Sequence, residues 1–65
     1  MTAQQARLDY DQAWNAFKKA VNDSGTTAYN LYHAPDRDIK VNNMVLRLND
    51  MITAIKAYET AVNGG

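Results

Sequence analysis

Few side chains in this chain can act as a nucleophile or a base: one serine, Ser24, one histidine, His33, and no cysteine. Ser24 and His33 bracket a short segment, so a nucleophile–base pair between them is conceivable. The sequence offers no orienting carboxylate and no oxyanion loop to complete such a site. We expect Ser24 to end one helix, His33 to lie at the polar end of another, and the chain to have no catalytic residues.

A second possible chemistry is metal binding by His33, Asp36 and Asp38, because imidazole and carboxylates are ordinary ligands of divalent cations. Their spacing matches no known metal-binding loop. Asp36 or Asp38 is also well placed to cap the helix that follows, where a carboxylate is favoured by the helix dipole. We therefore expect no metal and no cofactor, and the pattern identifies no small-molecule ligand.

The most function-like pattern is a row of adaptable side chains, Met44, Met51 and Tyr58, which recurs every seven residues. Methionine fits irregular or interchangeable partners. Together with Tyr29 and Tyr32, this row is our candidate protein-interaction surface. The alternative is that the row forms the flank of the chain's own core, covered by the two tyrosines.

Charge argues against nucleic acid as a partner, because seven basic and seven acidic residues cancel. A helix–short helix–helix order resembles a helix-turn-helix DNA-binding motif, which stays open as a third interpretation. That motif needs a tight turn and a basic recognition helix, whereas the last helix here carries only Lys40, Arg47 and Lys56 as cations. The chain lacks the features of a signal peptide and any long apolar run, so we expect a cytoplasmic protein without a membrane partner.

The first element that positions these residues is an amphipathic helix predicted over residues 2–23, with Thr2 as its N-cap and Gly25 ending it. Its apolar seam alternates spacings of three and four residues and consists of Ala3, Ala6, Tyr10, Ala13, Phe17 and Ala20. Trp14 and Val21 flank this seam. Because alanine permits close approach, we expect the ridge of Ala6, Ala13 and Ala20 to lie where another helix axis comes nearest.

A longer amphipathic helix is predicted over residues 38–63, with an apolar arc of about 140°. Leu46 falls on its polar side and Glu59 within the arc. If the two helices are antiparallel, Trp14 should face Val45, Leu48 and Ile52. The predicted core is shared by both helices and contains Tyr10, Trp14, Phe17, Val21, Val41, Val45, Leu48, Ile52, Ile55 and Val62.

The connection is predicted to hold a short helix over residues 26–33, capped by Thr26 and ended by Pro35. Leu31 and at least one of Tyr29 and Tyr32 should cover one end of the hairpin.

These patterns predict an all-α fold: one domain, residues 1–65, in which two helices of similar length form an antiparallel hairpin. A chain of this size buries only ~60% of its unfolded surface, and without cysteines it has no disulfide, so assembly is the main remaining source of stability. The leading functional hypothesis is a non-catalytic module that self-associates into a four-helix bundle. The second is a small monomeric inhibitor or adaptor that binds a heterologous protein through the apolar flank of the last helix.

Overall fold

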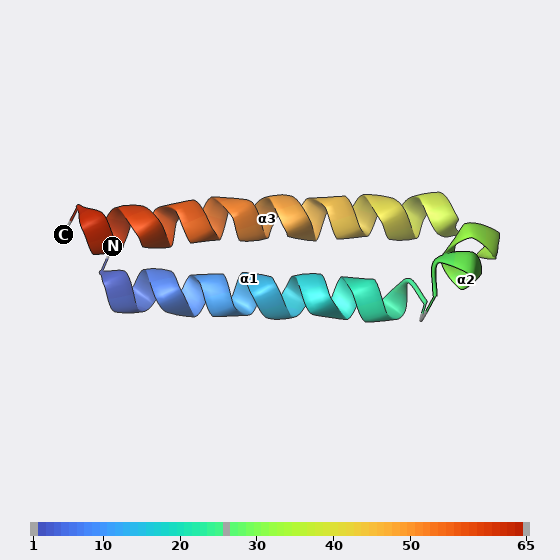
Figure 1. Cartoon of the computed structure of the whole chain (residues 1–65), viewed down its shortest axis with the longest axis horizontal. Coiled ribbons are helices and arrows are strands. Elements are labelled where there is room, and N and C mark those ends of the chain that lie inside the picture. Colours follow the sequence, from blue (N-terminus) through green and yellow to red (C-terminus); the bar gives the residue numbers. More distant parts are fainter. Residues whose placement is uncertain (1, 26, 65) are drawn as a thin grey trace.

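The computed structural model describes residues 2–25 and 27–64. It contains three helices, α1 (Ala3–Asp23), α2 (Ala28–His33) and α3 (Arg37–Asn63). Helices α1 and α3 lie side by side and antiparallel, α2 joins them at one end, and the two chain ends lie together at the other (Figure 1). The molecule is a rod of 47 × 14 × 13 Å. The predicted all-α hairpin with a short helix in its connection is confirmed.

Helix α1 begins and ends as its sequence predicts. The Thr2 hydroxyl accepts a hydrogen bond from the Gln5 amide at 3.1 Å, which satisfies one of the free N–H groups of the first turn. At the other end, the Ser24 hydroxyl donates to the Val21 carbonyl at 2.7 Å, so Ser24 is engaged in the helix terminus. Gly25 follows with φ +122°, a conformation that L side chains rarely adopt, and the chain leaves the helix axis there.

Helix α2 is capped by Thr27, whose hydroxyl accepts from the Asn30 amide at 3.1 Å. The predicted cap, Thr26, lies outside the described residues. Ala34 adopts an extended conformation before Pro35, so the helix ends where proline requires it. Leu31 is half-buried, but Tyr29 and Tyr32 are 72% and 65% exposed, so the prediction that one of them covers the core is wrong for the single chain.

Helix α3 begins one residue earlier than predicted and is longer than α1, with 27 residues against 21. The predicted match in helix length is therefore wrong. Asp36 occupies the N-cap position without a side-chain cap bond, and its carboxylate lies 3.5 Å from the Lys40 ammonium instead. At the end of the rod where α2 lies, α3 extends beyond the last turn of α1 (Figure 1).

Small residues line the seam between α1 and α3, as predicted for α1. Ala6 and Ala20 are buried and Ala13 is half-buried, so the alanine ridge is confirmed as the site of close approach. On α3 the half-buried residues of the seam are Met44, Met51, Ala54, Tyr58 and Ala61. The rings of Tyr10 and Tyr58 stack with centroids 6.4 Å apart, which fixes the register of the two helices.

The predicted core is wrong for most of its members. Tyr10 and Phe17 are half-buried, but the other eight predicted core residues are between 37% and 56% exposed: Trp14, Val21, Val41, Val45, Leu48, Ile52, Ile55 and Val62. Trp14 therefore does not pack into an intramolecular core against Val45, Leu48 and Ile52.

The row predicted as a free flank, Met44, Met51 and Tyr58, packs against α1 instead. The reason is its neighbouring row on α3, which contains Ala54 and Ala61. Two rows that combine flexible and small side chains let α3 approach the alanine ridge closely, whereas a row of branched side chains would hold the two axes apart. Two helices cannot cover an apolar arc as wide as that of α3, so its branched residues stay exposed.

Candidate protein-interaction face

Large apolar side chains are exposed along one side of the hairpin. We call this surface the apolar face and define it by residues of both long helices: Trp14, Val21, Val41, Val45, Leu48, Ile52, Ile55 and Val62. Scattered exposed hydrophobic residues are normal on a monomer, whereas a set of this length on one side makes that side a candidate interaction surface.

Helix geometry places the residues from α1 and α3 on the same side. Trp14 follows the seam residue Ala13 by one position, and Ile52 follows the seam residue Met51 by one position, a rotation of about 100° in each helix. Because the helices are antiparallel, these rotations run in opposite senses when viewed from one end. Both therefore lead to the same side of the hairpin.

The surface hollows agree with this assignment. One hollow is lined by Val21, Leu31 and Met44, so apolar residues of all three helices meet on one side near α2. A hollow on the other side is lined by polar residues of α1 and α3, including Lys19, Asp23, Asn43 and Arg47. The hairpin thus has one apolar side and one mainly polar side, and Leu8, Ile39 and Leu46 are exposed outside the apolar face.

Charged residues continue the rows of the apolar face at one end, and a lysine lies at its outer edge on α1. Arg7 lies seven residues before Trp14, and Glu59 lies seven residues after Ile52, so each continues a row of the face. Lys18 places its ammonium 5.8 Å from the centre of the Trp14 ring, at the outer edge of α1. Such a cation–π contact at an exposed ring is worth ~0.5 to 1 kcal/mol and keeps Trp14 oriented along the face.

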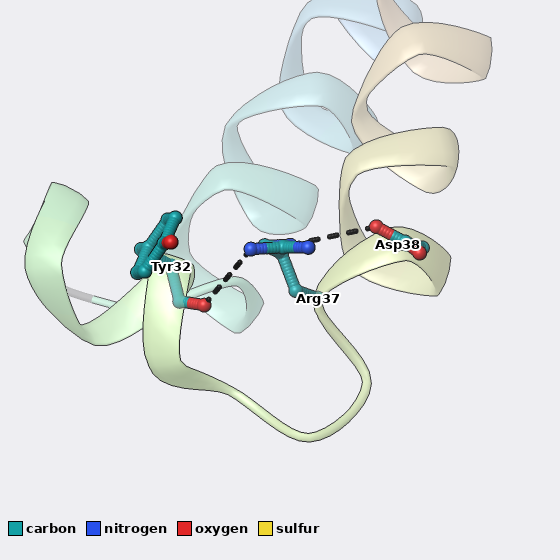
Figure 2. A network of polar contacts seen from close by, with 3 residues as sticks. All are labelled: Tyr32, Arg37 and Asp38. Carbon is teal, nitrogen blue, oxygen red and sulfur yellow. Dashed lines mark hydrogen bonds and ion pairs between the residues drawn. The ribbon is translucent and has the colours of Figure 1, made fainter.

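A second exposed cluster occupies the α2 end of the hairpin. The ring of Tyr29 lies 4.3 Å and that of Tyr32 lies 5.0 Å from the His33 ring, measured between centroids. The Arg37 guanidinium lies 5.0 Å from the centre of the Tyr32 ring, donates to the Tyr32 carbonyl at 3.4 Å and contacts the Asp38 carboxylate at 3.4 Å (Figure 2). Of the predicted interaction surface, only Tyr29 and Tyr32 are therefore exposed, whereas Met44, Met51 and Tyr58 are half-buried.

The candidate catalytic and metal-binding residues make contacts with other side chains or with the backbone. The Asp36 and Asp38 carboxylates pair with Lys40 and Arg37. Within residues 2–25 and 27–64, no three acidic, histidine or cysteine side chains come together as a metal site would require. No helix of the described chain has the length and apolar character needed to span a membrane.

Searches against protein-family models, curated proteins and solved structures found no match to this chain.

The sequence pattern predicted the residues of the apolar face as core, although it also contained a signal for their exposure. On α3, the row of Met44, Met51 and Tyr58 runs beside a second row with the same spacing, which ends in Ala54 and Ala61. The spacing alone does not identify the seam, because Val41, Leu48, Ile55 and Val62 have it too. The signal is the small size of Ala54 and Ala61, which lets this side of α3 approach the alanine ridge of α1.

Proposed function

We propose that this chain is a non-catalytic protein-interaction module whose apolar face binds a second copy of the same hairpin, forming a four-helix bundle. The observation that carries the proposal is the lack of large buried side chains. Among the described residues, only Ala6 and Ala20 are buried apolar residues, and no large side chain is fully buried. A domain needs such a core to offset the conformational entropy of folding, and face-to-face pairing would supply it.

The solvent-accessible surface area of the chain supports pairing with a second hairpin of the same size. The chain exposes 4962 Å². A compact monomer of 7.3 kDa would expose ~4,200 Å². The excess of roughly 800 Å² matches the area that each partner buries in a standard-size stable interface.

Charge and symmetry favour a second copy as the occupant. The chain has no net charge, so two copies do not repel each other at long range. Two-fold pairing is the commonest closed form of self-association, and it covers the same face on both copies.

The test is sedimentation equilibrium between ~1 and ~200 μM, with thermal melts over the same concentrations. We expect a species of twice 7.3 kDa and a melting temperature that rises with protein concentration, since association stabilises the folded state by mass action. A monomer at ~200 μM with a concentration-independent melting temperature would show the proposal to be wrong. The same face would then be tested against a heterologous protein.

A further inference from the structure

Each long edge of the apolar face carries a row of residues with one charge, and the charges of the two rows are opposite. On α1, residues spaced by seven form the row Arg7, Trp14 and Val21. Residues with this spacing lie on nearly the same side of a helix, so the row has one cation followed by two apolar residues. Arg7 is exposed, and Trp14 and Val21 belong to the apolar face.

The corresponding row on α3 is Val45, Ile52 and Glu59. It has two apolar residues followed by one anion, and all three are exposed. Its order is the reverse of the α1 row. Because α1 and α3 run antiparallel, the charged ends of both rows lie toward the same end of the hairpin, the end that holds the chain termini (Figure 1).

The stacked pair of Tyr10 and Tyr58 fixes how far along the rod each residue lies. Counting from this pair at 1.5 Å per residue, three pairs of residues are level to within about 3 Å, which is less than one helical turn. These pairs are Arg7 with Glu59, Trp14 with Ile52, and Val21 with Val45.

Two hairpins can pair through the apolar face with two different two-fold axes. An axis parallel to the helices leaves every residue at its own level and lays α1 of one copy against α3 of the other. The level pairs then become contacts between copies, and Arg7 meets the partner's Glu59. An axis perpendicular to the helices lays α1 against α1 and α3 against α3, each with its direction reversed.

The perpendicular axis places charges against apolar residues. When it is centred on Trp14 and Ile52, Arg7 lies opposite the partner's Val21, and Glu59 lies opposite the partner's Val45. An unpaired charge beside an apolar surface loses hydration without gaining a partner, whereas the parallel axis gives each charge an opposite one. The next row outward repeats the match, because Asp11 is level with Lys56 to about 1.5 Å.

We infer that the two copies pair about an axis parallel to the helices, with α1 of each copy antiparallel against α3 of the other and both α2 helices at one end. This inference rests on the proposed self-association. It assigns an ion pair between Arg7 and the partner's Glu59, formed twice in the dimer. It also places two Tyr29–Tyr32 clusters side by side at the α2 end.

The orientation is tested by a distance between the α2 ends of the two copies. The chain has no cysteine, so Asn30→Cys, at an exposed position of α2, gives a single attachment site for a spin label. With helix axes ~8 to 10 Å apart in the bundle, pulsed electron paramagnetic resonance should give a label separation under ~30 Å. The perpendicular axis would separate the labels by nearly the 47 Å length of the rod.

The outcomes separate the two proposals. A dimer with the short distance supports the inference. A dimer with the long distance overturns the orientation and leaves the self-association standing. A monomeric mass without any distance between labels overturns both.

An exchange of charges tests the ion pair itself. Arg7→Glu and Glu59→Arg should each weaken self-association about tenfold at low ionic strength, because each variant creates two like-charge contacts in its own dimer. Mixing the two variants, or combining both changes in one chain, should restore wild-type affinity. Lys19→Glu, on the polar side, is the control and should change nothing. If the mixture associates no more tightly than either variant alone, the inferred contact is wrong.

Discussion

The pair of substitutions Leu48→Glu and Leu46→Glu tests the apolar face with its own control. Both residues lie on α3, both are leucines, and both are exposed in the hairpin, Leu48 to 37% and Leu46 to 61%. They are two positions apart and therefore point to roughly opposite sides of the helix. Only Leu48 belongs to the apolar face, so the same chemical change is made inside and outside the proposed interface.

The expected magnitude follows from the exposed area of Leu48. Full burial of a leucine is worth ~1.5 to 3 kcal/mol, so covering the exposed third of Leu48 contributes roughly 1 kcal/mol per copy. A glutamate there loses this contribution and also loses hydration, at a cost of at least ~1 kcal/mol per copy even when the carboxylate reaches the rim. Two copies give roughly 4 kcal/mol, about a thousandfold in the dissociation constant.

Sedimentation equilibrium measures the result directly. If wild type dimerises near ~1 μM, Leu48→Glu should stay monomeric up to ~1 mM, whereas Leu46→Glu should dimerise like wild type. Circular dichroism at each concentration reports whether the monomer keeps its helices, but the conclusion depends on mass alone. Equal weakening by the two substitutions, or a Leu48→Glu dimer at ~10 μM, would refute the reasoning that places Leu48 inside the interface.

Three further predictions concern the seam and the face. Met51→Glu should abolish the helical circular dichroism signal at ~10 μM, because Met51 packs against α1, and a folded Met51→Glu monomer would mean that this row is free. Ala20→Leu should destabilise the hairpin by ~1 to 3 kcal/mol in urea melts, because Ala20 is 4% exposed at the point where the helices approach closely. The control Ala57→Leu, at an exposed position, should leave the stability unchanged. Equal urea midpoints for the two variants would contradict the assignment of Ala20 to the seam. Trp14 fluorescence should shift to shorter wavelength as protein concentration rises through the dimerisation range, since pairing removes Trp14 from water, and a constant spectrum across that range would place Trp14 outside the interface.

The helix ends and turns could be predicted from the sequence because they depend on residues that are close together in the chain. The Thr2 cap, the turn at Gly25 and the end of α2 before Pro35 each involve groups within a few residues of one another. Backbone hydrogen bonding and steric exclusion decide such features locally, so residue type and spacing suffice. The alanine ridge of α1 was also readable, because it is the only narrow strip of small residues on that helix.

The choice of which strip of α3 faces α1 was not readable from amphipathicity. Its apolar arc is wider than a single partner helix can cover, so hydrophobicity alone allowed either the branched row through Ile52 or the row through Met51 to form the seam. Shape decided between them. The alanine ridge of α1 accepts a surface of flexible and small side chains, and this packing leaves the branched row exposed.

The sequence by itself determined three helices, their approximate ends and an antiparallel hairpin, because helix periodicity, caps and a short connection act over short distances. Only the tertiary structure decided that Met44, Met51 and Tyr58 pack in the seam between α1 and α3. It also decided that Trp14, Leu48 and Ile52 are exposed on one common face. The physical reason is that the pairing of two helices depends on complementary shape across the seam, and complementarity is a property of both surfaces together.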